Sequence, residues 1–340
     1  MTVRILGIGW ATPLGRDRDA VWSAIRRGDA PSPGRLTNPF NQCEFPVFRV
    51  DPATVGDVAR LPRLRRSSAI SHFSMAAAKD ALASAGCDPA PGRLALVFAV
   101  TNGGVIYTRR FFEEVSRSGT HAGSPLLFPE TVYNAPASHI AAALGITGIA
   151  TTIVNDATAG IDAIAAACEL LESGACDRCL VVAAEEADWT ICEGYKAWRL
   201  AADAPPIVPF GGGGTIFGEG AAALLLGADG GGAIVGQVHQ GAAFRNPAEA
   251  RHLLAACGGT AARIVVSAAS GTKFDAAEAD LRAAEIHIAP KVSLGEAFAA
   301  STVMQVACAA LALENCAAGT LAFVPAVGLQ GQVAAVTLRA

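Results

Sequence analysis

The segment from Ile153 to Leu171 has the pattern of a reactive turn. A β-branched apolar run stops abruptly, and a turn of small residues leads into a long helical pattern. In many enzymes such a turn carries the nucleophile, because the positive end of the helix dipole stabilises an anion. The candidates here are Asp156, Ala157 and Thr158, and none is an obvious nucleophile. The turn therefore has the form of a catalytic position without its reactive group.

The thiols and imidazoles of the chain form no evident site either. Cys176 and Cys179 are a lone CxxC pair, whereas a zinc site normally needs a second pair or suitably spaced histidines. We expect the nine cysteines to be reduced structural thiols, and we expect no metal and no organic cofactor. The histidines fall in no recognised motif and are expected to be structural: His72, His121, His139, His239, His252 and His287.

Composition indicates a cytoplasmic protein with a large core. Of the 340 residues, 52% are hydrophobic and only 16% are charged. The net charge of −4 gives no general footprint for nucleic acid or for an anionic membrane. The apolar run at the N-terminus is too short for a membrane span and lacks a signal-peptide cleavage pattern.

Short apolar runs alternate with longer helical patterns along the chain. Strands are expected at 3–9, 94–100, 150–154, 179–184 and 218–226, and after a glycine-rich spacer at 233–239, 263–268, 286–289, 321–325 and 333–338. Helices are expected at 18–27, 66–85, 135–144, 158–172, 247–256, 275–284 and 298–316, and an irregular loop at 31–50. The alternation predicts an α/β architecture with helices on both faces of the sheets, and an internal duplication.

Four segments together resemble the β-ketoacyl-[acyl carrier protein] synthases of the thiolase superfamily. They occur in the order found in that family and span nearly the whole chain. The segments are Gly7–Gly15 (GIGWATPLG) with Trp22 in the next helix, the turn described above with Gly160, Ile164 and the following LVVAAEE at 180–186, Pro209-Phe210 with FGEGAAALLL at 217–226, and KVSLG at 291–295.

The resemblance implies a thiolase-like five-layer αβαβα fold with two halves related by a pseudo-twofold axis. We place a complete first half at 1–228 and a shortened second half at 229–340, with much of the loss around 240–275. The resemblance also implies a dimer in which strand 150–154 pairs with its counterpart. The apolar, β-branched run from Ile149 to Val154 suits a strand buried on both faces.

The family uses a cysteine on the turn and two histidines, and this chain departs at all three positions. Gly160 and Ile164 place Ala157 at the cysteine position, and a one-residue slip would place Asp156 there. Ser270 takes the first histidine position within 267–272, and Glu296 takes the second. Because a methyl group cannot form a thioester, we do not expect the chain alone to catalyse the standard condensation.

Simple structural roles compete with catalytic ones for the surviving polar residues. Asp156 is expected to cap the helix that follows it, Ser270 to bond within its own loop, and Glu296 to form an ion pair with Lys291. The same resemblance assigns Leu329 to the position of the phenylalanine that gates the acyl pocket, and Phe217 to the substrate pocket. The stretch 63–66 is either a solvated helix start or a contact for an acidic carrier protein.

Three functions remain open at this point. The favoured one is a chain-length-factor-like partner of an active ketosynthase, in polyketide or fatty acid biosynthesis, that works with an acyl carrier protein. Such proteins of aromatic polyketide systems usually have glutamine at the cysteine position, so Ala157 is a departure. The alternatives are a stand-alone acyl-thioester decarboxylase, hydrolase or acyltransferase that uses Ser270, Glu296 or Asp156, and an acyl-binding or scaffolding protein. The dimer is expected to be a heterodimer with the ketosynthase, or otherwise a homodimer.

Overall fold

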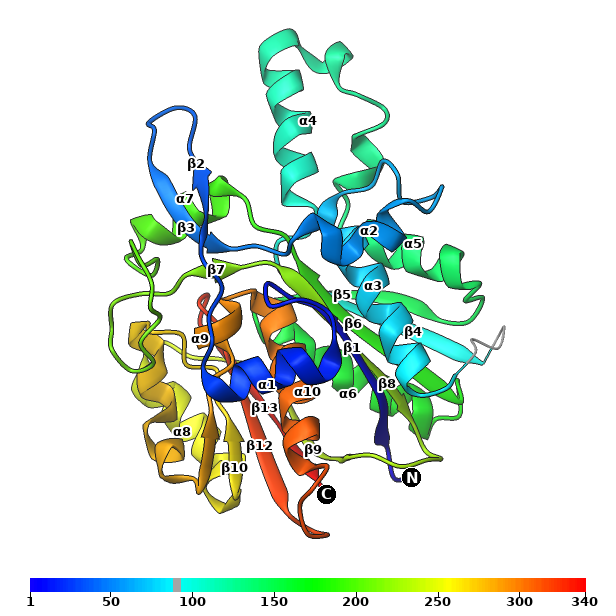
Figure 1. Ribbon diagram of the computed structural model, residues 1–340, viewed down its shortest axis with the longest axis vertical. Coiled ribbons are helices and arrows are strands. Elements are labelled where there is room, and N and C mark those ends of the chain that lie inside the picture. Colours follow the sequence, from blue (N-terminus) through cyan, green and yellow to red (C-terminus); the bar gives the residue numbers. More distant parts are fainter. Residues whose placement is uncertain (88–92) are drawn as a thin grey trace.

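The strands of the structure, a computed structural model that describes residues 1–87 and 93–340, repeat one arrangement twice (Figure 1). The first set is β1 Arg4–Ala11, β4 Leu94–Val100, β5 Ala150–Val154, β6 Arg178–Glu185 and β8 Gly220–Gly227. The second set is β9 Ile234–Ala243, β10 Ile264–Val266, β11 Ile286–Ile288, β12 Leu321–Val327 and β13 Gln332–Arg339. The spatial orders β1-β8-β6-β4-β5 and β9-β13-β12-β10-β11 are the same, and so is the pattern of parallel and antiparallel pairs. The two sets join where Arg4 of β1 pairs with Ile234 of β9.

Helices cover both faces of each half-sheet. They are α1 Arg18–Arg27, α2 Gly56–Ala59, α3 Ala69–Ser84, α4 Val105–Ser118, α5 Ala135–Leu144, α6 Ala159–Glu172, α7 Trp189–Ala197, α8 Pro247–Ala256, α9 Lys291–Leu294 and α10 Phe298–Leu313. Short 3₁₀ helices lie at η1 Pro52–Val55, η2 Thr120–Ala122, η3 Phe128–Glu130, η4 Gly259–Ala261 and η5 Lys273–Ala283. Within the described residues, no helix combines the length and apolarity needed to cross a membrane.

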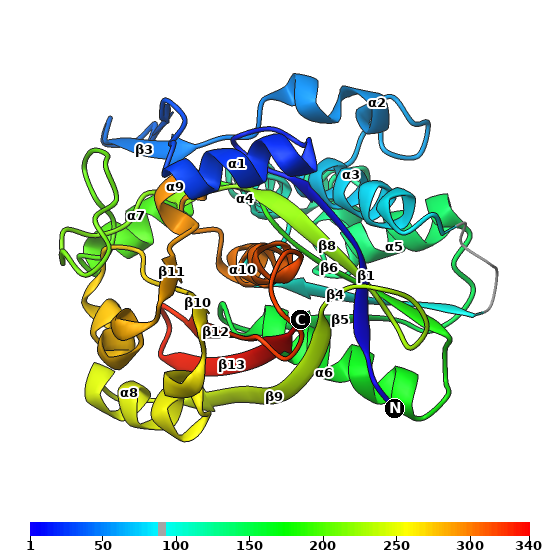
Figure 2. The same cartoon turned by 60° about the horizontal axis from the view of Figure 1, so that its bottom comes forward.

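Three apolar cores define five layers. One core joins α3 and α5 to the outer face of the first half-sheet. The central core places α6 and α10 between the two half-sheets, and the third joins α8 and η5 to the second half-sheet. Figure 2 shows α10 in the middle of the molecule, and all but one of its 16 residues are buried. A helix that is apolar on every side suits this position and no exposed one.

The GIG segment of β1 explains why glycines are needed at the start of the chain. A Cβ on Gly7 would lie 2.1 Å from the carbonyl oxygen of Ala81, and one on Gly9 would lie 2.2 Å from that of Ala77. Strand β1 therefore packs directly on the backbone of α3, which only residues without a side chain allow.

Several local expectations were wrong. The loop expected at 31–50 contains β2 Gly34–Thr37 and β3 Glu44–Phe48, which form a small sheet with β7 Phe217–Gly218. The helix expected at 275–284 is the 3₁₀ segment η5, and α4 and α7 were not predicted. Pro46 lies within β3. Proline is normally confined to the margins of sheets, so the sequence of this segment predicted a loop.

Strand β5 is the end strand of its half-sheet and is not buried on both faces. Ile149, just before it, and Val154 at its end are 43% and 47% exposed. Among the residues that the structure describes, only β4 pairs with it, so its other edge has backbone groups without a strand partner. The expectation of a doubly buried strand is therefore wrong for the single chain.

Candidate functional site

The turn between β5 and α6 lies where three parallel strands end. The carboxyl ends of β4, β5 and β6 share one edge of the sheet, so the turn adjoins the loops that follow β4 and β6. The side chain of Ala157 is buried, and its carbonyl oxygen accepts a hydrogen bond from the hydroxyl of Thr302 on α10, 2.6 Å away. A buried methyl group thus occupies the position that the sequence assigned to the nucleophile.

Asp156 binds a distant loop and does not cap α6 with its side chain. Its Oδ2 accepts a hydrogen bond from the backbone N–H of Gln330 at 2.8 Å, and its Oδ1 accepts one from Ala157 at 2.8 Å. The cap residue of α6 is Thr158, and no side-chain hydrogen bond caps this helix. Burial raises the pKa of Asp156 above its ordinary value. The predicted capping role is therefore wrong, because the carboxylate connects the turn to residues 328–331.

Gly328 makes this connection possible, and we expect Gly328→Ala to disrupt it. A Cβ at this position would lie 1.9 Å from Oδ2 of Asp156. The overlap should lower the free energy of unfolding by about 1–3 kcal/mol, measured by urea denaturation. Gly213→Ala, which adds a methyl group in open space, should change it by less than about 0.5 kcal/mol. If Gly328→Ala is as stable as the wild type, the loop does not pack on Asp156.

Lys291 and Glu296 form the expected ion pair. Their side chains are almost fully buried, and Lys291 Nζ lies 2.5 Å from Glu296 Oε2. The other carboxylate oxygen accepts a hydrogen bond from the backbone N–H of Phe298 at 2.8 Å. Both oxygens of Glu296 are therefore engaged inside the protein, and the structural role expected for this carboxylate stays a prediction.

Ser270 belongs to a separate network around Asp275. The carboxylate of Asp275 accepts hydrogen bonds from the backbone N–H groups of Ser270, Gly271 and Phe210, at 3.0, 2.8 and 2.8 Å. In the described part of the chain, no hydrogen bond joins Ser270 to Asp156, Lys291 or Glu296. The structure thus brings Lys291 and Glu296 into contact and leaves Ser270 in a loop organised by Asp275.

A buried carboxyl group beside this loop should make stability depend on pH. Glu278 accepts hydrogen bonds from the hydroxyl of Ser267 and the N–H of Ala268, and burial raises its pKa from 4.5 to about 8. The folded protein then holds a proton that the unfolded chain releases, so stability should fall as pH rises from about 4.5 to about 8. Urea denaturation of Glu278→Gln across this range should show a shallower fall. An unchanged slope would contradict the raised pKa.

Phe217 and Leu329 lie in one aromatic cluster. Both are buried there with Tyr195 and Phe298, and the rings of Phe217 and Phe298 stack with centroids 5.6 Å apart. Gln330 Nε2 donates to the hydroxyl of Tyr195 at 3.1 Å, so the cluster adjoins the loop held by Asp156. The assignment of Leu329 and Phe217 to a substrate pocket stays a prediction.

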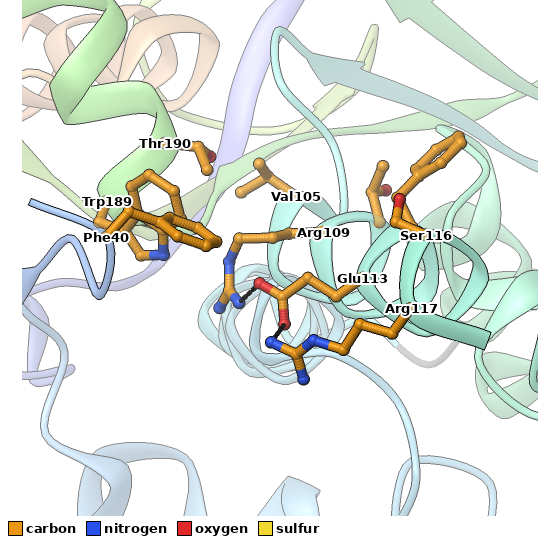
Figure 3. A pocket seen from close by; sticks show the side chains of 10 residues that line it. Phe40, Val105, Arg109, Glu113, Ser116, Arg117, Trp189 and Thr190 are labelled. Atoms are coloured by element: carbon orange, nitrogen blue, oxygen red, sulfur yellow. Dashed lines mark hydrogen bonds and ion pairs between the residues drawn. The ribbon is translucent and has the colours of Figure 1, made fainter.

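A hollow beside α4 was missed by the sequence reasoning (Figure 3). It has a volume of about 520 Å³. Helix α4 extends away from the body of the molecule (Figure 1), and none of its residues is buried. The lining residues are Phe40, Val105, Thr108, Arg109, Phe112, Glu113, Ser116, Arg117, Trp189 and Thr190. The exposed aromatic residue Phe112 within an amphipathic stretch was the available signal.

Other predicted features have simpler surroundings. His72 Nε2 lies 2.8 Å from the carbonyl oxygen of Leu64, and His139 pairs with Glu130 at 2.7 Å. Cys176 and Cys179 are free thiols, and the described residues contain no group of three side chains able to hold a metal. Leu64 is buried and anchors an exposed basic segment that consists of Arg60, Arg63, Arg65 and Arg66.

Comparison with known proteins gives concordant matches. The N-terminal domain family of β-ketoacyl synthases matches residues 1–229. A putative polyketide β-ketoacyl synthase 2 of Streptomyces cyaneus is 27% identical over 224 residues, which are 61% of this chain and 51% of the relative. The chain thus matches about half the length of that curated relative.

Solved structures match over the full length. The ishigamide ketosynthase/chain length factor aligns with a TM-score of 0.80 at 20% identity, covering 100% of this chain and 99% of that one. A type II polyketide synthase acyl carrier protein in complex with its ketosynthase bound to the hexaketide gives 0.82 at 15% identity, with coverage of 100% and 99%. A β-ketoacyl synthase of Burkholderia phymatum STM815 gives 0.81 at 16%, covering 99% of each chain. The thiolase-like five-layer fold expected from the sequence is confirmed.

Proposed function

The chain belongs to the β-ketoacyl synthase family, and we propose that it is a non-condensing subunit that pairs with an active ketosynthase. In this role it resembles a chain length factor of polyketide or fatty acid biosynthesis and shapes the space in which the partner extends an acyl chain. The observation that carries the proposal is the buried methyl group of Ala157 at the position of the nucleophile. Condensation needs a thiolate there to accept the acyl group.

The surroundings of Ala157 support a subunit that has lost the reaction. Both oxygens of Glu296 are bound by Lys291 and by the backbone of Phe298. Both oxygens of Asp156 accept hydrogen bonds from backbone N–H groups, so both carboxylates have contacts within the chain. Internal contacts thus engage two of the three groups that an altered enzyme could use, Asp156 and Glu296.

The free edge of β5 supports a partner chain. An edge strand with one unpaired edge, flanked by the exposed side chains of Ile149 and Val154, is a surface that proteins normally cover. A counterpart strand from a ketosynthase would satisfy the free backbone groups and bury these side chains.

The hollow beside α4 supports a role toward the acyl chain. Helix α4 follows β4 directly, and Thr101 between them accepts a hydrogen bond from the N–H of Ala299 on α10 at 3.3 Å. Ala157 contacts the same helix through Thr302. The start of α4, which lines the hollow, and the turn of Ala157 therefore lie at the same end of the sheet.

The exposed basic segment supports contact with an acyl carrier protein. The side chains of Arg60, Arg63, Arg65 and Arg66 form no ion pair with the described residues, although the whole chain has a net charge of −4. A local excess of positive charge steers an acidic partner.

The test is co-expression with a ketosynthase encoded beside this chain. We expect native mass spectrometry to show a one-to-one heterodimer, and a malonyl-carrier condensation assay to require both chains. Ala157→Cys should not be needed for activity. A homodimer that turns over an acyl thioester alone, and loses that activity in Ser270→Ala or Glu296→Ala, would overturn the proposal in favour of a stand-alone enzyme.

A further inference from the structure

We propose that the hollow beside α4 selects an acyl chain that bears ketone oxygens over a fully saturated chain, and that Arg109 determines this selection. The inference rests on the proposed function, because it assumes that an acyl chain reaches the hollow. It adds the chemical class of that chain and the residue that recognises it.

The apolar part of the lining suits a hydrocarbon chain. Phe40, Val105, Phe112 and Trp189 line it, and the rings of Phe40 and Trp189 meet edge to face with centroids 5.9 Å apart. Phe40 and Phe112 are 76% and 59% exposed, so their rings are open to a ligand. Aromatic and aliphatic surfaces of this kind bury methylene groups favourably.

Arg109, one turn after Val105 on α4, presents a fixed guanidinium group to the hollow (Figure 3). Arg109 Nε lies 3.0 Å from both carboxylate oxygens of Asp188, and its Nη1 lies 2.7 Å from Glu113 Oε1. Its guanidinium carbon lies 5.9 Å from the centroid of the Trp189 ring. Within residues 1–87 and 93–340, no hydrogen bond engages Nη2. Arg109 is therefore held in one orientation and keeps spare donor hydrogens at the wall of the hollow.

The charges around Arg109 determine which acceptor fits. A guanidinium group only donates hydrogen bonds, so its ligand must accept them. Asp188 and Glu113 already face Arg109, and Arg117 lies 3.8 Å from Glu113, so the four charges cancel. A neutral oxygen then fits better than a carboxylate or phosphate, which would meet Glu113 and Asp188. A ketone is a neutral acceptor that an acyl chain can carry, whereas a saturated chain would cover Nη2 without giving it a partner.

The experiment compares two ligands on the full-length chain. S-decanoyl-pantetheine and S-(7-oxodecanoyl)-pantetheine are titrated while tryptophan fluorescence is followed, and Trp189→Phe identifies the signal that comes from the hollow. We expect the oxo ligand to bind about tenfold more tightly than the saturated one, because its ketone accepts one hydrogen bond from the charged guanidinium group of Arg109.

Variants separate recognition from folding. Arg109→Met would leave the charge of Asp188 buried without a cation. A second variant, Arg109→Met/Asp188→Asn, removes that charge and keeps an oxygen to cap α7 through the N–H of Thr190. The oxo preference should fall to within about twofold in both variants. It should stay at its wild-type value in Arg110→Met, an exposed arginine of the same helix that does not line the hollow.

Three results would each overturn the inference. The wild type could bind the two ligands equally, it could bind neither, or the preference could survive in the double variant. The proposed function fails by a different result, namely the absence of a heterodimer or of condensation that depends on both chains. A chain that pairs with a ketosynthase but shows no oxo preference would therefore contradict only the role of Arg109.

Discussion

Lys291→Met should destabilise the protein by about 3–5 kcal/mol, because it leaves the carboxylate of Glu296 buried without its cation. Lys291 and Glu296 are 2% and 0% exposed, so water cannot replace the lost ammonium group. Urea or thermal denaturation measures the change directly. This is the largest stability effect that we expect from a single substitution in the site.

Two further variants show whether the uncompensated charge is the cause. Lys291→Met/Glu296→Gln removes both charges and keeps an amide oxygen for the N–H of Phe298, so most of the lost stability should return. Lys196→Met breaks the exposed pair with Asp203 and should cost less than about 1 kcal/mol. A double variant as unstable as Lys291→Met would show that packing of the lysine, and not its charge, supports this region.

Thr152→Pro should weaken the proposed heterodimer by about tenfold to a hundredfold while the chain still folds. The N–H of Leu96 donates to the carbonyl of Ile149, and the N–H of Asn155 donates to the carbonyl of Val100. Because residues of a strand alternate, the backbone groups of residues 149, 151, 153 and 155 face β4, and the N–H of Thr152 faces the free edge. Proline removes that donor and leaves a carbonyl of the partner unpaired, which costs about 1–3 kcal/mol.

Thr152→Val is the matched control, because it changes the side chain and keeps the N–H. It should pair with the ketosynthase as the wild type does, and proline at an outward-facing position of an edge strand should leave the fold intact. Thermal denaturation checks the fold, and native mass spectrometry of a dilution series measures the dissociation constant. A heterodimer of unchanged affinity in Thr152→Pro would show that the partner does not extend the sheet at β5.

The three altered positions are stabilised in three different ways. Ala157 is fixed through its own backbone by Thr302, Glu296 is neutralised by Lys291, and Ser270 sits in a loop organised by Asp275. All of these contacts form within the chain, and none of them involves a ligand. The structure around the three positions is therefore held by the chain's own residues.

The periodic elements were predictable because their signals are local. The strands at 94–100 and 150–154 and the helices at 135–144 and 247–256 have the bounds expected from the sequence. The ion pair between Lys291 and Glu296 was also predictable, since a carboxylate in an apolar stretch needs a nearby cation. Helix α4 has an amphipathic pattern that the sequence analysis overlooked, and the hollow that it lines with Phe40 and Trp189 depends on contacts between distant segments.

The sequence by itself determined the prediction that Ala157, Ser270 and Glu296 stand at the three positions where the family has a cysteine and two histidines. Only the tertiary structure decided which contacts surround these residues. The carboxylate of Asp156 meets the N–H of Gln330 across 174 positions of sequence, and the hollow combines Phe40, α4 and Trp189 from three separate segments. Such contacts depend on how two half-sheets pack around α10, and neither composition nor periodicity records which distant residues that packing brings together.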